Sequence, residues 1–496
     1  MQFHVAYSSY LNRKYTKMKA LYHAIRDAIH EGHLIHGEKL PSTRELAATY
    51  HISRGTVNQV YDTLTAQGYI QSEHGRGTFV AYQLDLSNDA STVKTCTHHL
   101  SAWGNRIQQF EQQTIQRNAP ANVDNHDASL ESDEVIDFSK YQPDLSKFPY
   151  DEWNNRLYAE IRQREHHLEA TSSIVSSMGE PRLREAIAAY LRRMRGIQVD
   201  PDHIAVTAGS MQAIALLTQL LADPGDHVVT ESPCYVGISK AILAAGAKLI
   251  EANLDGQGVV PQDWEARMLF VTPSRQFPTG EMLSLERRQT LLDWAHRHDA
   301  MIVEDDYDSE FRYRGMHVEP LKTLDKAGRV IYLGSFTKTL PFEVRLGFVV
   351  LPPTLADTFR KAQALYEPRP VNLIEQRALA AFMTSGQYER HLRRMNRLYS
   401  RKFHLLLKLL NQQLSTGFDW VENEAGLHVF GWWRGNVSTY EAFRASAKSQ
   451  GVVYSEVSSS TAAGTKYGLY LSFAHLSDAQ LQEGISRLKN AATTPS

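Results

Sequence analysis

The sequence predicts two domains, a small, mainly helical head and a large α/β domain. The chain has 496 residues, more than one ordinary domain holds. Short apolar runs alternate with longer helical patterns from about residue 136 onward, which is typical of βα units around a buried parallel sheet. A polar stretch separates this region from the N-terminal part. We therefore expect a head over residues 15–82, a polar linker over 83–134 and an α/β domain over 135–490.

Composition narrows the class of protein. With 42% hydrophobic residues the chain can bury at least one sizeable core. Its cysteines, Cys96 and Cys234, imply no disulfide framework and favour a reducing compartment. No uncharged apolar run approaches the roughly 20 residues of a membrane span, and residues 1–14 lack the apolar core of a signal peptide. These features predict a cytoplasmic protein that does not enter a membrane.

The stretch between the two domains has a composition of its own. Gln108–Asn118 is rich in glutamine and asparagine, and Asp124–Glu134 leans acidic. Such residues bury little apolar surface, which favours a linker over an interaction segment. One short helix is expected around Ile107–Ile115.

The large domain is predicted from a series of strand-like runs. Helical patterns such as Met211–Leu221 and Leu285–His296 lie between several of them. From Gln387 onward the pattern changes to helix, strands and helix, which predicts a smaller α+β lobe over about 387–490. The predicted strands are His203–Thr207, His227–Thr230, Lys248–Ala252, Met268–Thr272, Met301–Glu304, Val330–Gly334 and Phe348–Leu351.

The head contains signals for short helices joined by a turn. Ser42 precedes a helical pattern, and Glu45 three residues later completes a capping box. Ser53 is placed to cap a further helix after a brief turn. This spacing predicts a helix-turn-helix, whose second helix enters the major groove of DNA. The expected buried faces are Leu21, Ile25, Ala28 and Ile29 on the first helix, and Val57, Val60, Tyr61 and Leu64 on the last.

Polar side chains on the last helix and on a following hairpin suit a DNA contact. Arg54, Thr56 and Asn58 lie on its solvent side, near the helix start, where they can reach base edges or phosphates. The hairpin tip Gly75-Arg76-Gly77 lets backbone approach a sugar–phosphate edge and supplies a charge. A helical protein-interaction module is the alternative that these residues leave open.

The ordered strings LPSTRELA, SRGTVNQVYDTLTAQGYI and GRGTFV resemble the winged helix-turn-helix of the GntR family across residues 18–81. The resemblance implies binding to double-stranded DNA. Asn58 stands where many relatives carry arginine, so the resemblance does not imply a base preference at that contact. The residues implied to touch DNA are Arg44, Ser53, Arg54, Thr56 and the wing around Gly75 to Gly77.

A lysine follows one strand-like run of the large domain. Lys338 lies in Gly334-Ser335-Phe336-Thr337-Lys338, and Arg345 follows seven residues later. A lysine can form an imine with an aldehyde cofactor, and a serine hydroxyl with an arginine fork can bind a phosphate. These are the needs of pyridoxal 5′-phosphate (PLP), although a lysine after a strand is more often a surface residue.

Acids end another predicted strand. Asp305 could keep a pyridine nitrogen protonated, and Tyr307 could donate a hydrogen bond to the ring oxygen of PLP. A solvated acidic cluster is the plain alternative. A metal site is disfavoured, and none is expected, because no histidine or second carboxylate run has matching spacing.

Two further segments complete the set. Gly209, Ser210 and Met211 form a turn between a strand and a helix, where backbone N–H groups and the helix dipole suit a phosphate. Tyr235 could stack on the pyridine ring, and it could equally be a core residue. All these residues follow strand-like runs, where open α/β sheets bind ligands.

Together these segments resemble fold-type I aminotransferases, and more narrowly the MocR-type regulators of the GntR family, over about residues 136–490. Further shared strings are Gly179-Glu180-Pro181, Gln276-Phe277-Pro278-Thr279-Gly280 and His391 to Arg394. The resemblance implies Lys338 as the imine lysine and Asp305 on the pyridine nitrogen. It also implies a homodimer.

The chain departs from the aminotransferase pattern at the substrate side. Phe277 replaces the asparagine that aminotransferases carry before Pro-Thr-Gly, as in the regulators, and Arg275 stands where those regulators usually show histidine. Tyr470 stands where relatives place the arginine that grips the substrate α-carboxylate. A tyrosine cannot form that charged bidentate clamp, which weakens amino-acid binding by roughly 1–3 kcal/mol.

The favoured interpretation is a DNA-binding transcriptional regulator that senses PLP, an amino compound or both through its aminotransferase-like domain. The alternative is a PLP-dependent aminotransferase with a DNA-binding appendage. A structural role with both sites vestigial is a third reading, against which the intact cofactor positions count. Tyr470 and the DNA-binding head count against the enzyme.

Overall fold

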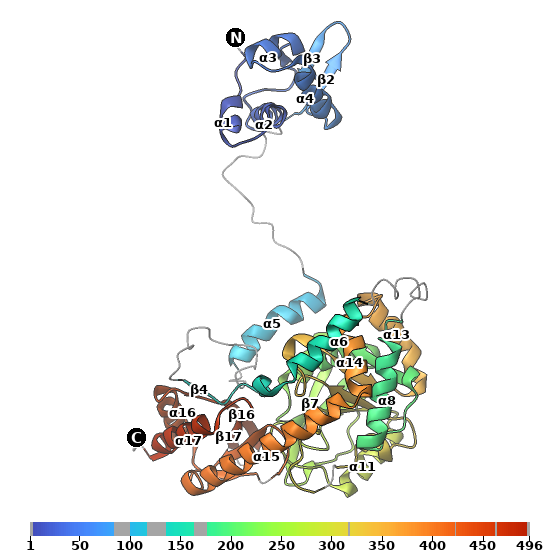
Figure 1. The fold of residues 1–496 in the computed structure, drawn as a ribbon, viewed down its shortest axis with the longest axis vertical. Coiled ribbons are helices and arrows are strands. Elements are labelled where there is room, and N and C mark those ends of the chain that lie inside the picture. Colours follow the sequence, from blue (N-terminus) through green and yellow to red (C-terminus); the bar gives the residue numbers. More distant parts are fainter. Residues whose placement is uncertain are drawn as a thin grey trace. The chain divides into compact units, whose positions relative to one another are not determined.

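The computed structural model describes residues 3–83, 100–116, 135–162, 176–315, 318–421, 423–461 and 464–493. The chain divides into two compact units, residues 1–99 and 100–496 (Figure 1). Most of the predicted linker, residues 83–134, lies outside the described residues. Its helix α5 (Ala102–Gln116), expected around Ile107–Ile115, belongs to the second unit, where the Arg106 guanidinium donates to the carbonyl of Ala244 at 2.9 Å.

The first unit is a helical head with a small sheet in the order β1-β3-β2. Its expected apolar faces are buried around one core. The core starts before the predicted boundary at residue 15, because Val5 and Tyr7 are also buried in it. The elements are α1 (Tyr7–Asn12), α2 (Lys17–His30), β1 (Lys39–Leu40), α3 (Thr43–Thr49), α4 (Arg54–Ala66), β2 (Ile70–Glu73) and β3 (Gly77–Val80).

The second unit is built on an eight-stranded sheet in the order β5-β12-β11-β10-β9-β6-β7-β8. Every strand-like run singled out in the sequence forms one of its strands. These are β5 (Ile204–Thr207), β6 (His227–Ser232), β7 (Lys248–Asp255), β9 (Met268–Val271), β10 (Met301–Asp306), β11 (Val330–Ser335) and β12 (Gly347–Val350), followed at the edge by β8 (Gly258–Val259).

Two strands depart from the expected parallel sheet: β12, and the short edge strand β8, which pairs with β7 in the antiparallel direction. β12 runs antiparallel to both β11 and β5. Residues 336–346, which join β11 to β12, are too few for the crossover helix that a parallel return requires. The purely parallel sheet was therefore a wrong expectation at this position.

Both faces of the sheet are covered by helices, as alternation along the strands requires. Val228 and Val303 face α9 (Ser210–Leu221), α10 (Val236–Ala245) and α13 (Pro353–Tyr366), whereas Val229 and Ile302 face α11 (Leu285–Arg297). Further helices are α6 (Tyr150–Arg162), α8 (Pro181–Arg195), α12 (Leu321–Leu324) and α14 (Leu373–Thr384), with one-turn segments η2 (Leu145–Lys147), η3 (Pro201–His203) and η4 (Phe342–Val344).

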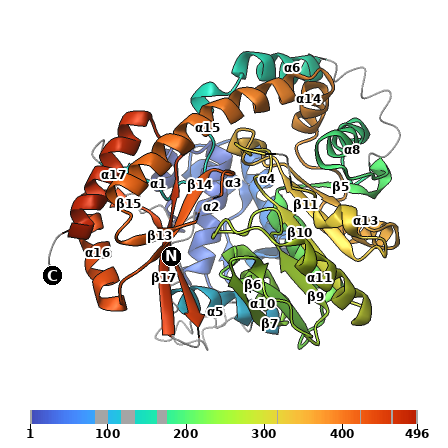
Figure 2. The ribbon, with the colours of Figure 1, turned by 90° about the horizontal axis from the view of Figure 1, so that it is seen from below.

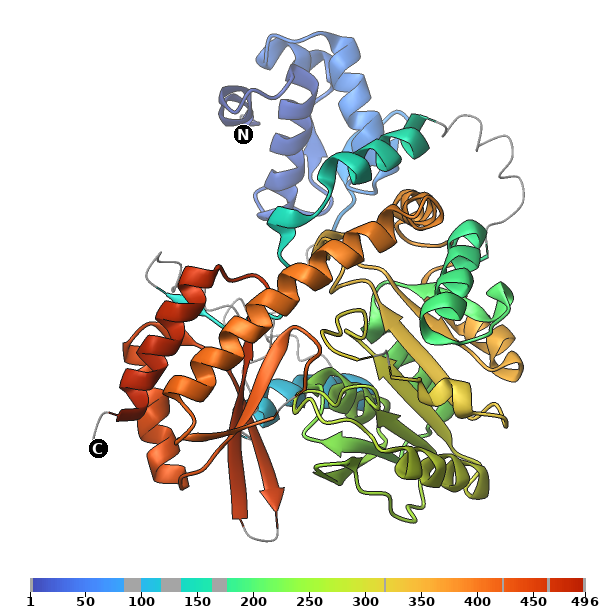
Figure 3. The ribbon, with the colours of Figure 1, turned by 60° about the horizontal axis from the view of Figure 1, so that its bottom comes forward.

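The C-terminal part forms a smaller lobe with a four-stranded sheet in the order β13-β14-β17-β16. Figure 2 shows this lobe beside the larger sheet, and Figure 3 shows the long helix α15 (Gln387–Gln413) running between the two. The other elements are β13 (Phe418–Trp420), β14 (His428–Trp433), α16 (Val437–Ser449), β15 (Val452–Val453) with its partner β4 (Ile136–Asp137), β16 (Ser455–Thr461), β17 (Gly464–Ser472) and α17 (Asp478–Thr493).

Candidate functional site

Helix α4 of the head presents the predicted DNA-reading face. Ser53 caps it, accepting a hydrogen bond from the Thr56 amide at 3.1 Å. Its buried face fixes the orientation of the helix, so Arg54 and Asn58 are exposed on the opposite side. Arg54 also reaches back to α3, where its Nε donates to Thr43 Oγ1 at 3.3 Å. The two helices therefore present their polar residues on one connected surface.

Helix α3 begins with the predicted capping box. Ser42 accepts from the Glu45 amide at 3.2 Å, and the Glu45 carboxylate accepts from the Ser42 amide at 2.8 Å. Arg44 is exposed in the first turn of this helix. A basic side chain in the first turn of a helix suits a contact with a DNA phosphate.

The hairpin β2–β3 forms the predicted wing. Gly75 and Gly77 have φ angles of +74° and +120°, a backbone region that other residues adopt only with strain. A side chain at position 77 would also displace the end of the Lys39 side chain. Arg76 is exposed and pairs with Glu73 at 2.7 Å, an ion pair that a phosphate can replace at little cost.

The predicted cofactor residues of the second unit gather at one edge of the large sheet. Asp305 and Ser335 stand at the ends of the parallel strands β10 and β11, and Gly209 follows the end of β5. Arg345 precedes β12, whose antiparallel direction brings its start to the same edge, where Gly347 pairs with both Ser335 and Thr207. Because the short β11–β12 connection makes β12 antiparallel, Arg345 lies at the same end of the sheet as Ser335 and Gly209.

Lys338 is held in place by a residue from the start of the second unit. Its Nζ donates to the backbone carbonyl of Tyr141 at 2.7 Å and lies 3.8 Å from the centre of the Tyr141 ring. Burial lowers the pKa of Lys338 to about 8, against the opposing effect of the Asp308 and Asp305 carboxylates. A lowered pKa makes the neutral, nucleophilic amine available close to neutral pH.

Asp305 fits the pyridine nitrogen of PLP. The residue is only 8% exposed, and its Oδ1 is buried without a hydrogen-bond partner among the described residues. Burial, and then the neighbouring Asp306 and Asp308 carboxylates, raise the pKa of Asp305 to about 7, although Lys338 opposes the shift. An unsatisfied buried acceptor of this kind calls for a charged donor, which a pyridinium N–H supplies.

The segments that the sequence predicts to bind the phosphate lie beside each other through their backbones. Gly209, with φ of +87°, starts α9, and a Cβ on Gly347 would press on the Gly209–Ser210 backbone. Ser335 Oγ accepts from the Thr337 amide at 3.2 Å. Arg345 is exposed in a left-handed conformation (φ +48°), and no contact in the described structure joins its guanidinium to Ser335. The backbone, rather than a side-chain contact, brings these residues together.

Tyr235 and Tyr307, which the sequence predicts to contact the pyridine ring of PLP, lie at the same site. A Cβ on Gly237 would meet both the Tyr235 ring and the Met211 sulfur, so these two side chains lie together at the start of α9. Tyr307 accepts a hydrogen bond from Arg275 Nη1 at 3.0 Å, which leaves its own hydroxyl hydrogen to donate to a ring oxygen.

Sequence reasoning missed a buried polar network around these residues. The Tyr141 hydroxyl donates to Asp308 Oδ2 at 2.5 Å, and Arg275 Nη1 pairs with the same oxygen at 3.2 Å. Arg275 Nη2 also donates to the His428 carbonyl at 2.8 Å. Tyr141, Asp308 and His428 are far apart in sequence; only Asp308, close to the singled-out acidic run, carried a signal.

The loop that carries Lys338 is anchored by α15. His391 Nε2 donates to the Thr339 carbonyl at 2.9 Å, and the Tyr388 hydroxyl lies 3.0 Å from Thr339 Oγ1. Burial lowers the pKa of His391 to about 4, so this histidine is neutral and acts as a structural tie. Of the string His391 to Arg394 noted in the sequence, His391 thus helps to position the loop that carries Lys338.

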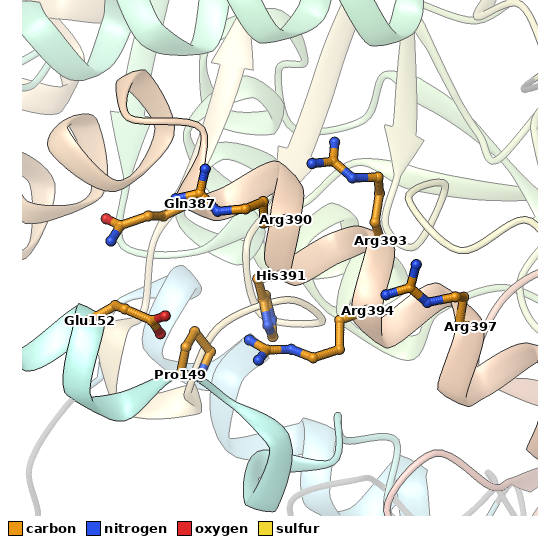
Figure 4. Close-up of a pocket in the computed structure, with 8 residues that line it drawn as sticks. All are labelled: Pro149, Glu152, Gln387, Arg390, His391, Arg393, Arg394 and Arg397. Carbon is orange, nitrogen blue, oxygen red and sulfur yellow. The ribbon is translucent and has the colours of Figure 1, made fainter.

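The outer face of α15 carries exposed arginines beside a pocket of about 270 Å³ (Figure 4). No residue predicted for the cofactor lines this pocket. Within the described ranges no group of three metal-ligating side chains occurs, and no helix is long and apolar enough to cross a membrane. The lining residues are Pro149, Glu152, Gln387, Arg390, His391, Arg393, Arg394 and Arg397.

The fold and the site together define a class: a winged helix-turn-helix head joined to a domain of the aminotransferase fold. Residues 17–80 match the family model of bacterial regulatory proteins of the gntR family, and residues 134–488 match that of aminotransferase class I and II. The chain belongs to the GntR family, as a MocR-type transcriptional regulator with an aminotransferase-like domain.

Curated relatives extend over both domains. "Probable rhizopine catabolism regulatory protein MocR" of Rhizobium meliloti is 36% identical over 482 residues, which cover 95% of this chain and 93% of the relative. The "HTH-type pyridoxine biosynthesis transcriptional regulator PdxR" of Corynebacterium glutamicum is 30% identical over 407 residues, covering 82% and 81% of the two chains.

Solved structures resemble the second unit. The α-aminoadipate aminotransferase LysN of Thermus thermophilus, complexed with a phosphopyridoxyl-leucine, is 24% identical with a TM-score of 0.66, over 79% of this chain and 98% of that one. Kynurenine aminotransferase of Pyrococcus horikoshii is also 24% identical, with a TM-score of 0.65, over 81% of this chain and 96% of that one. These similarities confirm the predicted aminotransferase fold.

Proposed function

We propose that this regulator binds PLP between Lys338, Asp305 and the phosphate cradle, and that the bound cofactor changes the affinity of the head for operator DNA. The observation that carries the proposal is the unsatisfied Asp305 Oδ1 in a buried site that also holds a lysine of lowered pKa. PLP, when bound, supplies an aldehyde for amines and an electron-withdrawing ring.

The residues of the chain have separate tasks in this proposal. Asp305 pairs with the ring nitrogen, Tyr235 lies against the ring and Tyr307 donates to its oxygen. Gly209, Ser210, Met211, Ser335 and Arg345 hold the phosphate through backbone N–H groups, a hydroxyl and a guanidinium. Lys338 attaches the cofactor. The dimer that such folds form would present two heads to paired half-sites of double-stranded DNA in the cytoplasm.

The cofactor acts in this proposal by shifting a population. A ligand moves an equilibrium only by its differential affinity for two states, so PLP, alone or with an amino compound, must favour one state of the second unit. That preference then changes how tightly the paired heads hold DNA.

A footprint on the protein's own promoter region, with and without PLP, tests this function. The protected region should change on adding PLP to the wild-type protein and stay constant in Lys338→Ala. A PLP-independent footprint in the wild type would contradict the proposal.

An aminotransferase is the second candidate, favoured by the intact Lys338 and Asp305. Turnover of amino acids by the PLP-loaded protein, at rates that depend on Lys338, would support it. The residues Phe277 and Tyr470 at the substrate side argue against efficient turnover, since neither offers the charged grip that an α-carboxylate needs.

A further inference from the structure

The substrate side of the lysine is lined by aromatic rings. The Tyr470 ring centre lies 5.6 Å from that of Phe277 and 5.2 Å from that of His428, and Tyr470 is only 4% exposed. The Tyr141 ring lies 5.1 Å from His428 and 6.0 Å from Phe277, and Lys338 Nζ stands 3.8 Å above it. We call Tyr141, Phe277, Tyr307, His428 and Tyr470 the aromatic cluster.

Apart from Lys338, which the cofactor would use, no cation without a carboxylate partner contacts the cluster among the residues that the structure describes. His428 donates through Nε2 to the Pro278 carbonyl at 2.7 Å, and burial, with Arg275 beside it, lowers its pKa well below the ordinary value. A neutral imidazole whose N–H is already used cannot hold a carboxylate.

Arg275, which contacts the cluster, already binds other groups. Arg275 pairs with Asp308 at 3.2 Å and donates to the Tyr307 hydroxyl and to the His428 carbonyl. A Cβ on Gly426 would collide with both Arg275 and Asp308, so the pair is tightly enclosed. The next cation on the same face of β17 is Lys466, whose backbone lies four residues, or about 13 Å, from that of Tyr470. Its ammonium group lies 4.7 Å from the centre of the Trp432 ring.

Tyr470 itself is buried in a largely apolar setting, in which the Ser455 hydroxyl is a polar neighbour. It packs with Phe430 and Val457 in a separate apolar cluster, against which Phe277 also lies. Strand pairing places Phe430 and Ser455 directly beside it. The position therefore offers ring surface, which favours apolar groups and cations over carboxylates.

We propose that the effector of this site is a primary amine with an apolar or aromatic body and no carboxylate on the carbon that bears the nitrogen. The amine nitrogen lies toward Lys338, and the body lies against Tyr470, Phe277 and Tyr141. This inference rests on the proposed function, because it assigns the ligand class of the same site.

Matched pairs of ligands that differ only in the carboxylate test the inference. Calorimetry on the full-length, PLP-loaded protein compares 2-phenylethylamine with L-phenylalanine, and 3-methylbutylamine with L-leucine. Since a charged hydrogen-bonded clamp is missing, each amine should bind about tenfold more tightly than its amino acid or better. Equal or tighter binding of the amino acids, or no binding of either amine, overturns the inference.

Variants of Tyr470 test the same ligand preference independently. Tyr470→Arg should improve the affinity for L-phenylalanine about tenfold and reduce the preference for the amine. The matched control Tyr366→Arg, at an exposed position of α13, should keep the wild-type order. Tyr470→Phe, which keeps the ring, should retain the amine preference, and its loss would overturn the role of that ring.

The outcomes separate this inference from the function on which it rests. A wild-type protein that does not take up PLP contradicts the proposed function. A protein that takes up PLP and responds to it on DNA, but prefers amino acids to amines, contradicts only the ligand class.

Discussion

Burial changes the acid–base behaviour of Lys338 and Asp305, the two side chains that we propose to bind the cofactor. Burial brings the pKa of the lysine down to about 8 and that of the aspartate up to about 7. Their mutual attraction opposes both shifts, so desolvation is the dominant cause in each case. A cationic ring nitrogen would offset the desolvation of the Asp305 carboxylate by donating a hydrogen bond to its unpaired Oδ1 atom.

Asp305→Asn should weaken PLP binding by about tenfold or more, because an amide cannot form the charged hydrogen bond to a pyridinium. Titration of the visible absorption of the protein with PLP gives the Kd. Asp263→Asn, in an exposed ion pair with Arg297, is the matched control and should leave the Kd unchanged. An unaltered Kd in Asp305→Asn would remove the aspartate from the site.

The rate at which PLP becomes attached should depend on pH through Lys338. Its pKa is lowered from 10.5 to about 8, so the neutral amine increases with pH and predominates above about 8. The attachment rate should rise about tenfold per pH unit below that value and level off above it. Stopped-flow absorbance measures this profile. A rate still rising steeply near pH 10, at about the ordinary lysine pKa, would contradict the lowered value.

Among single residues, those next to a strand or helix signal could be predicted and the others could not. Asp305, Ser335 and Gly209 end runs of β-branched and apolar residues, so their place at a sheet edge follows from the sequence pattern. Tyr141 and His428 reach the site only through tertiary packing of distant segments, which a local pattern does not contain.

Helix ends carry much of the local information in this chain. Both caps predicted in the head, at Ser42 and Ser53, are formed. The strands of the large sheet were also recognisable, because buried strands need long apolar runs. The direction of β12 was not, since orientation depends on the length of the connection rather than on the strand's own residues.

Ser42→Ala should lower the free energy of unfolding of the head by about 1 kcal/mol, because it removes the side-chain hydroxyl that accepts the hydrogen bond from the Glu45 amide at the start of α3. Hydrogen exchange of the α3 and α4 amides reports this stability in the full chain. Ser8→Ala, at an exposed position in α1, should change it by less than about 0.5 kcal/mol. Equal effects of the two substitutions would show that the cap contributes nothing.

Arg54→Ala should weaken binding to operator DNA by about tenfold and reduce its salt dependence, since the exposed guanidinium at the start of α4 contacts the duplex in our proposal. Fluorescence anisotropy at several salt concentrations measures both quantities. PLP uptake should be unchanged. Arg13→Ala, at the exposed end of α1, is the control and should keep the affinity for DNA. An equal loss of affinity in Arg13→Ala would show that the net charge of the head, rather than a contact made by Arg54, causes the effect.

The whole molecule consists of two compact units with separate cores. A ligand that binds one folded unit stabilises that unit by mass action, by about 2.7 kcal/mol at 100 times its Kd. PLP should therefore raise the unfolding temperature of the second unit and leave the head's transition in place. Differential scanning calorimetry would show this, and Lys338→Ala should shift less. A shift of both transitions together would mean that the units unfold as one.

Helix α15 is a long helix that connects two distant parts of the second unit, the loop that carries Lys338 and the segments around Asp144 and Ala474. Near its start, His391 holds the backbone beside Lys338, and eleven residues later Lys402 holds Asp144 and the carbonyl of Ala474. At the rise of an α-helix these anchors stand about 16 Å apart. Because the helix keeps its length, a movement of Asp144 and Ala474 at one anchor is transmitted to the other. We therefore expect a displacement of the C-terminal lobe to change the position of the loop that carries Lys338.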